Sequence, residues 1–295
     1  MKVQNTSRTV SFKGLIPAST LKELAKKNTL ESKRLLNSCL GFNAVYKGAE
    51  NLNPDKVARQ IQDKFHINTD FGNNPIVASF CALTANIFQK LGWAKPTGFF
   101  LRNFNGTYYQ NALGICMTHK RDDSLYSKFK KDFPLRSVIM NSFPDWWSIQ
   151  ECMIPVREQN HFSTNHFLAP FIHEFVHSAH YAHLLKKYKD GTEIMNRMQR
   201  EFTNQKTIVM IQKETSNYGA QSPCELIAEE MTELIVNSLD PKTILPDVKV
   251  FKMLRKQEPN LMDELIDASW NYDEEKLKNF DCLKSHVCAF MYDKK

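Results

Sequence analysis

The stretch "PFIHEFVHSAHYAHL", residues 170–184, decides how the rest of the chain is interpreted. It contains the pattern His-Glu-x-x-His, formed by His173, Glu174 and His177. Residues four apart lie on one face of an α-helix, so both imidazoles can reach a single metal ion. Apolar residues recur at helical spacing on a neighbouring face, namely Ile172, Phe175, Val176 and Ala179. The stretch therefore predicts a helix over about 166–189 that presents two histidines beside a buried apolar stripe.

The flanking residues suggest where this helix begins and ends. Three neighbouring polar residues, Ser163, Thr164 and Asn165, are candidates for the N-cap. Pro170 suits the first turn, because its missing N–H would have no intrahelical partner there. Gly191 suits the position just after the helix.

A zinc site needs a third protein ligand, and the histidines that follow in the same stretch are the nearest candidates. His183 falls at the spacing of the metzincin pattern His-Glu-x-x-His-x-x-Gly-x-x-His, but His180 replaces the glycine that lets the chain leave the helix. On a continuous helix His183 lies about 240° around the axis from His177, and His180 lies about 10 Å along the axis from His173. We therefore expect His183 to point away from the ion, and His180 to be a neighbour of the site or a residue of the helix surface.

The later segment "SNYGAQSPCELIAEEMTELIVN", residues 216–237, offers a carboxylate instead. Ser222 and Pro223 suit the N-cap and the first position of a helix. On that helix Glu225 and Glu229 lie four apart on one face. Glu225 can bind the ion, and Glu229, one turn further on, can accept the remaining ring N–H of a ligand histidine.

Ordinary structural roles compete with this interpretation. The spacing Ser222-x-x-Glu225 also fits a capping box, in which the glutamate only reaches back to the N-cap N–H, and the residues alone leave this alternative open. Tyr218, in the loop before the helix, is either a half-buried loop tyrosine or a hydrogen-bond donor to a developing oxyanion. Glu230 and Glu233 are expected to be solvated or to form ion pairs. One helix over 192–211 is expected to connect the two segments.

Together the two segments resemble the zinc-peptidase domain of anthrax lethal factor and its relatives, which are gluzincins with a zincin-like fold. That family has His-Glu-Phe-Gly-His, followed downstream by Tyr-Gly-x-x-Asn-x-x-Glu-Phe-Phe-Ala-Glu. Here "HEFVH" and "YGAQSPCELIAE" fall in register with those segments, and the resemblance covers about 166–237. The chain departs from the family pattern at four positions, namely Val176, Ser222, Leu226 and Ile227.

The resemblance implies a zinc metallopeptidase with one Zn²⁺ ion. The roles that it implies are zinc ligand for His173, His177 and Glu225, general base for Glu174, oxyanion stabilisation for Tyr218 and support of a ligand histidine for Glu229. None of the departures removes a group that the reaction needs. The alternatives are a catalytically silent binding or scaffold protein with a zincin fold, and a zinc hydrolase that acts on a non-peptide substrate.

The remaining pattern predicts an α+β, zincin-like fold, with a small mixed sheet, then the active-site helix and a mainly helical C-terminal part. Predicted strands lie at 98–104, 113–119, 136–142 and 149–156. Helices are predicted at 20–27, 53–65, 73–93 and 124–133. We expect a helical N-terminal extension over 1–72 and a metallopeptidase domain over 73–295. Within that domain the motif-bearing core is 98–240 and the helical C-terminal part is 241–295.

The composition is that of an ordinary globular protein. The 295 residues carry a formal net charge of +7 without a long basic run, so we expect no nucleic-acid partner. No apolar run of about 18 residues predicts a membrane span, and the N-terminus lacks the apolar centre of a signal peptide. The seven scattered cysteines fit reduced thiols. We therefore expect a cytoplasmic location, or export without a signal peptide, and a protein or peptide substrate. No motif indicates the cleavage specificity or the oligomeric state.

Overall fold

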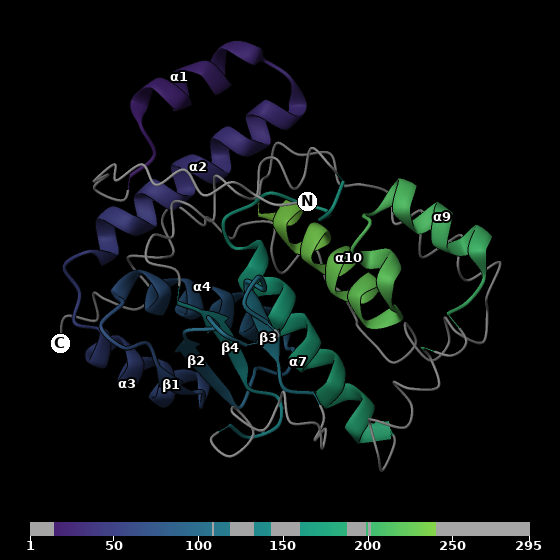
Figure 1. Ribbon diagram of the computed structural model, residues 1–295. Helices are drawn as coiled ribbons and strands as arrows, with labels where there is room; N and C mark the ends of the chain where they lie inside the picture. The colour runs from purple at the N-terminus through teal and green to yellow at the C-terminus, as the bar shows by residue number, and fades with distance from the viewer. Residues whose placement is uncertain are drawn as a thin grey trace.

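The computed structural model describes residues 15–107, 109–118, 133–142, 160–187, 199 and 202–239. These residues form seven α-helices, one short 3-10 helix and a four-stranded mixed sheet, as the α+β prediction requires (Figure 1). The predicted strand at 149–156 and the predicted C-terminal helices over 241–295 lie outside the described residues. So does almost all of the predicted helix at 124–133.

The first four helices are α1 (Ala18–Lys27), α2 (Leu30–Ala49), α3 (Pro54–Phe65) and α4 (Pro75–Leu91). Helices α3 and α4 begin as their Asn-Pro pairs predict. The Asn53 and Asn74 side chains each accept two backbone N–H hydrogen bonds, and a proline takes the first helical position. Helix α4 ends at Gly92, whose φ of 72° is readily adopted by glycine. Local capping chemistry therefore explains both helices.

The sheet has the strand order β1 (Asn68–Asp70), β2 (Gly98–Arg102), β4 (Val138–Asn141), β3 (Gly114–Cys116). Strands β1, β2 and β4 run parallel, whereas β3 pairs antiparallel with β4 and forms one edge. The predictions at 98–104, 113–119 and 136–142 located three of the four strands. Strand β1 was not predicted from the sequence, and it lies inside the segment that was predicted to be helical. Helix α4 connects β1 to β2, as a parallel pair requires.

One hydrophobic core joins the N-terminal helices to the motif-bearing segments. A single cluster of buried side chains extends from Ile16, before α1, to Leu239, after α10 (Pro223–Ser238). The helices α2 and α3 pack against α4, and α4 packs against α7 (Ala169–Lys187). The described part of segment 1–72 is therefore packed into the same core as the histidine motif.

The aromatic side chains of α7 fix the direction in which its histidines point. The Phe171 ring contacts the Phe80 ring on α4, with centroids 5.2 Å apart, and stacks on the Phe99 ring on β2 at 5.9 Å. One turn later the Phe175 ring contacts the Phe88 ring of α4 at 5.3 Å. A residue two positions on from either phenylalanine lies about 200° around the helix. His173 and His177 occupy those positions and therefore face away from α4.

The connection between α7 and α10 differs from the prediction of one helix over 192–211. Residue 199 is helical, residues 202–203 form a turn, and α9 (Gln205–Glu214) begins afresh. The Asn204 side chain accepts the backbone N–H groups of Lys206 and Thr207, so this residue caps a new helix. The single-helix prediction is wrong because the Thr-Asn pair favours a cap over the helix interior. Residues Gly219–Gln221 form the 3-10 helix η1 before α10.

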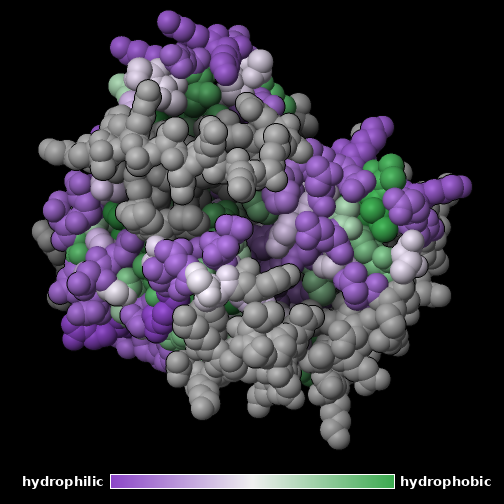
Figure 2. Space-filling view, viewed as in Figure 1, coloured by the Kyte–Doolittle hydropathy of each residue, from purple (hydrophilic) through white to green (hydrophobic). Residues whose placement is uncertain are grey.

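The described surface contains few exposed apolar side chains. In Figure 2 the part of the face that is coloured by hydropathy is largely hydrophilic, with small separate hydrophobic patches, one of them over α9. The large apolar residues that are exposed lie on three different helices, and they are Leu30, Leu40, Leu185 and Val209. Among the helices that the structure describes, none combines the length and the apolarity needed to cross a membrane.

Candidate metal centre

The helix α7 that carries the motif begins at Ala169, with Pro170 in its first turn as predicted. The predicted N-cap residues are wrong, because Ser163, Thr164 and Asn165 precede the helix by several residues. Thr164 Oγ1 instead accepts the N–H of His166 within this lead-in segment, at 3.3 Å. Gly191, the predicted residue after the helix, lies outside the described part of the chain.

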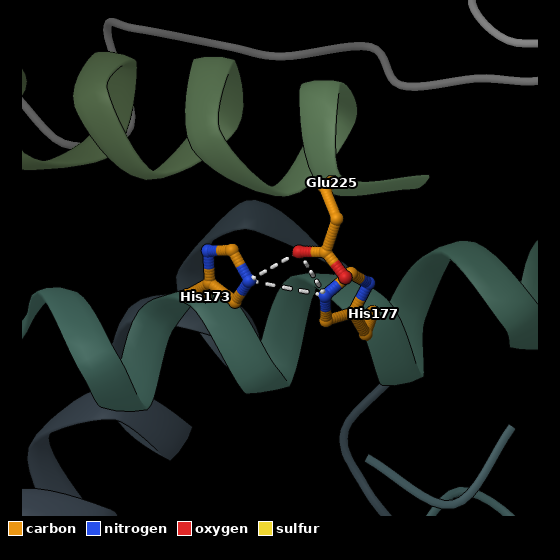
Figure 3. Close-up of side chains that lie close together, drawn as sticks. All are labelled: His173, His177 and Glu225. Carbon is orange, nitrogen blue, oxygen red and sulfur yellow. Dashed lines mark hydrogen bonds and ion pairs between the residues drawn. The ribbon is translucent and has the colours of Figure 1, made fainter. Parts of the chain in front are cut away.

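His173, His177 and Glu225 converge on one point between α7 and α10 (Figure 3). The Nε2 atoms of His173 and His177 lie 3.0 and 3.2 Å from Glu225 Oε2, and 3.1 Å from each other. Figure 3 shows both imidazoles directed from α7 towards the carboxylate, which descends from the first turn of α10. The structure therefore brings together the two histidines of the motif and the carboxylate suggested by the downstream segment.

The other histidines of α7 do not join this cluster. Because α7 continues to Lys187, His183 stays on the helix and is not turned back to His173 and His177. His180 is buried, and burial, aided by the nearby His177 and His183, lowers its pKa to about 3. His180 is therefore an uncharged neighbour at neutral pH.

The start of α10 distinguishes the two roles that the sequence left open for Glu225. Ser222 Oγ accepts the backbone N–H of Glu225 at 3.1 Å, so the serine caps the helix as predicted. The Glu225 carboxylate does not reach back to complete a capping box but contacts the two histidines. Burial alone would raise the pKa of this carboxyl, but His177 and His173 together lower it well below its usual range.

Glu229 lies one turn beyond Glu225 and contacts the far side of a histidine ring. Its Oε1 atom is 2.9 Å from His173 Nδ1, and its side chain is buried. Burial opposes protonation of His173, but hydrogen bonds to Glu225 and Glu229 outweigh this effect and raise its pKa well above the usual value. A metal ligand must be a neutral imidazole, and in that form, with Nδ1–H donated to Glu229, the ring would present the Nε2 lone pair to the cluster.

The Glu174 carboxyl is buried beside the cluster, against the edge strand β3. A Cβ atom placed on Gly114 would lie 2.9 Å from Glu174 Cγ, so the glycine leaves room for this side chain. Glu174 Oε2 is buried and has no hydrogen-bond partner among the described residues. Burial is the main reason that the pKa of Glu174 is raised, although His173 and His177 lower it in part.

Tyr218 covers the cluster from the loop before α10. Its ring centroid lies 5.7 Å from that of His173, and its other ring contacts are His161 at 5.6 Å and Phe162 at 5.2 Å. Burial and the neighbouring carboxylates, Glu225 foremost among them, raise the pKa of its phenol, and a hydrogen bond to Glu225 contributes. The hydroxyl therefore remains a proton donor throughout the neutral range.

The donor set and its spacing fit a zinc ion. Two imidazole nitrogens and a carboxylate oxygen are common zinc ligands, at about 2.0–2.2 Å from the metal. Atoms in a tetrahedral arrangement at those distances lie about 3.3–3.6 Å apart. The observed separations of 3.0–3.2 Å differ from this by a few tenths of an ångström. A His173–His177–Glu225 cluster of this kind can hold a metal ion.

No family model matches the chain, and no similar protein was found among curated proteins or among solved structures.

Some residues around the cluster had roles that the sequence did not predict. Ser163 and Ser216 both contact Glu229, but a single serine carries no signal of such a role. Gly114 did carry a usable signal, because an isolated glycine in a strand often marks a close approach by another group. Glu230, which was expected to be solvated or ion-paired, is instead buried beside Thr215.

The burial of Glu230 predicts a pH-dependent stability that glutamine would remove. Burial raises the pKa of this carboxyl from 4.5 to about 8, although a hydrogen bond from Thr215 opposes the shift. Between these two values the unfolded chain loses its proton before the folded protein does. The free energy of unfolding should therefore fall by up to about 1.4 kcal/mol per pH unit, and the Glu230→Gln variant should lack this component.

Urea unfolding of the metal-free protein between pH 5 and pH 9 measures this difference. At pH 8 and above Glu230→Gln should be more stable than the wild type. Glu214→Gln, which removes an exposed carboxylate at the end of α9, provides the control. Equal pH profiles for the wild type and Glu230→Gln would contradict the assignment.

Proposed function

We propose that this protein is a zinc-dependent metalloendopeptidase with a zincin-like fold. The observation that carries the proposal is the convergence of His173, His177 and Glu225, with Glu174 buried beside them. The predicted resemblance to the lethal factor peptidase domain assigns the same residues to the same site. The arrangement of a mixed sheet, a motif-bearing helix and a second helix that supplies a glutamate also supports a zincin-like fold.

The three protein ligands would leave one position of the metal open for water or substrate. When bound, zinc supplies a Lewis acid that polarises the substrate carbonyl and lowers the pKa of water at the open position. The chain must then hold the ligands still and keep His173 in the tautomer that exposes Nε2. Glu229 performs the second task by its contact with His173 Nδ1.

Glu174 would act as the general base. It adjoins His173 in the sequence, and its buried carboxyl has an oxygen without a hydrogen-bond partner among the described residues. In this role the carboxylate accepts a proton from the attacking water and then donates it to the leaving amine. Its raised pKa makes the carboxylate a stronger base than an exposed glutamate, which suits a group that must accept a proton from water.

The edge strand β3 is the element that would hold an extended substrate. It pairs with β4 on one side, and no strand in the described part of the chain pairs with its other side. Extended peptides bind such edges through main-chain hydrogen bonds. Gly114 on β3 lies against Glu174, so a peptide on this edge would pass close to the proposed base. The proposed substrate is therefore a protein or peptide segment in extended conformation.

Tyr218 is proposed to donate a hydrogen bond to the carbonyl oxygen as negative charge develops on it. We expect Tyr218→Phe to lower kcat by about 100-fold with little change in KM, because an oxyanion donor acts mainly in the transition state. The ring contacts with His173 and Phe162 remain in the variant, so zinc affinity should fall far less than kcat, even though the hydrogen bond from the hydroxyl to Glu225 is lost.

Steady-state kinetics on a cleaved peptide, together with zinc titration, test this role. Tyr46→Phe removes a hydroxyl from a half-buried tyrosine on α2 and serves as the control. If kcat of Tyr218→Phe equals that of the wild type, Tyr218 only packs the loop.

The proposed function is tested by zinc analysis of the purified protein and by its action on a peptide library. One zinc per chain, with cleavage that a chelator stops and zinc restores, is the expected result. Absence of bound zinc would overturn the proposal. Bound zinc without cleavage of any peptide would instead indicate a scaffold protein or a hydrolase for another substrate.

A further inference from the structure

Ser216 occupies a fully buried position between the metal cluster and the loop that carries Tyr218. Its hydroxyl donates to Glu229 Oε2 at 3.2 Å and accepts the backbone N–H of Gly219 at 2.9 Å. One hydroxyl can make both bonds, because it has one proton and two lone pairs. Ser216 therefore connects the turn over residues 216–219 to the carboxylate that supports His173.

Ser163 also bonds to the same carboxylate oxygen. Its backbone N–H donates to Glu229 Oε2 at 2.5 Å, and its hydroxyl donates to the Glu229 carbonyl oxygen at 3.0 Å. With Oε2 engaged by Ser163 and Ser216, Oε1 is directed at His173 Nδ1. The two serines thus fix the direction of the Glu229 carboxylate through Oε2, and Oε1 contacts the histidine.

Two main-chain hydrogen bonds keep these two supports together. The N–H of Asn217 donates to Asn160 O at 2.8 Å, and the N–H of Tyr218 donates to His161 O at 3.0 Å. The segments over 160–163 and 216–219 therefore form one unit around Glu229. A Cβ atom on Gly219 would lie 3.2 Å from Ser216 Oγ and 3.5 Å from Glu229 Cβ, so this unit is closely packed.

We propose that Ser216 is a positioning residue that, through Glu229, holds His173 ready to bind the metal. The inference rests on the proposed zinc site but not on peptide cleavage. A buried carboxylate that loses one of its donors becomes less favourable and less fixed in direction. Without the Ser216 hydroxyl, Glu229 would share Oε2 only with Ser163 and would hold the His173 ring less well. The Gly219 N–H would also lose its acceptor.

The variant Ser216→Ala should bind zinc about 10-fold more weakly, at the lower end of the range for groups that support metal ligands. Competition titration of the full-length protein with a zinc chelator measures this affinity without any turnover. Ser79→Ala removes a buried hydroxyl on α4 whose one hydrogen bond among the described residues is to the Pro75 carbonyl, at 3.0 Å, and it should bind zinc like the wild type.

A double-mutant cycle with Glu229→Gln separates this role from a general structural one. If Ser216 acts through Glu229, the Ser216→Ala change should cost little further zinc affinity in the Glu229→Gln background. An equal loss in both backgrounds, or no loss in the wild-type background, would overturn the proposal. If the wild type itself binds no zinc, the proposed function fails, which is a separate and recognisable result.

A second pair of variants covers the case in which Ser216→Ala does not fold. Ser216→Thr and Ser216→Val have nearly the same shape and differ in the hydroxyl, so any strain from the added bulk affects both. The threonine variant should bind zinc more tightly than the valine variant by about the same 10-fold factor. Equal zinc affinities in this pair would contradict a role for the hydroxyl.

Discussion

The variant Glu174→Gln is expected to cleave peptides about 10²–10⁴-fold more slowly than the wild type and to bind zinc equally well. Glutamine keeps the size of the buried side chain but cannot accept the proton of the attacking water. The carboxyl of Glu174 is not among the three groups that converge at the cluster, so the metal should be retained. Slow cleavage with unchanged zinc binding distinguishes a general base from a metal ligand, whose loss would also weaken zinc binding.

Measurement of kcat and of bound zinc on the same preparation tests this expectation. Glu214→Gln, which removes an exposed carboxylate far along the chain from the motif, should behave as the wild type. Unchanged cleavage by Glu174→Gln would exclude Glu174 as the base. Loss of zinc together with activity would show that Glu174 shapes the metal site instead.

The variant Glu225→Ala is expected to lose stoichiometric zinc. Removal of a direct ligand should weaken zinc binding by more than the roughly 100-fold upper limit for supporting residues. Two histidines on one helix would then remain, and a stable protein site for zinc normally has at least three protein ligands. Peptide cleavage should disappear at ordinary zinc concentrations for the same reason.

Metal analysis of the wild type beside Glu225→Ala gives the most direct comparison, because it tests the metal and the choice of third ligand together. Glu233→Ala, on the same helix α10 but outside the cluster, is the matched control and should retain zinc. Full zinc content in Glu225→Ala would exclude Glu225 as the third ligand and would leave the other histidines of α7 as the candidates.

The parts of the site that the sequence predicted are those fixed by local rules. Helical periodicity places His173 and His177 on one face, and the Ser-Pro pair starts α10 at the position that brings Glu225 to its first turn. The stripe through Phe175 predicted which face of α7 would be buried. Each of these inferences depends on residues within a few turns of one another.

Most of the parts that the sequence did not predict depend on contacts between distant segments, and one depends on a local signal. Strand β1 has three residues, and it is defined by its pairing with β2 rather than by any pattern of its own. Ser163 looked like a helix cap, yet it bonds to Glu229, 66 residues later. The break before α9 follows a local cap at Asn204, a signal that was present but was outweighed by the helical pattern around it.

The packing of α2 against the segment just before α7 has a practical consequence for work with fragments. The Phe167 N–H donates to Ser38 Oγ at 2.9 Å, and the Phe167 ring contacts the Phe42 ring. A shortened protein that begins at residue 73 would expose this aromatic surface and lose strand β1 from the sheet. The smallest unit suitable for expression, crystallisation or inhibitor screening must therefore retain α2, α3 and β1, although none of them supplies a residue to the metal cluster.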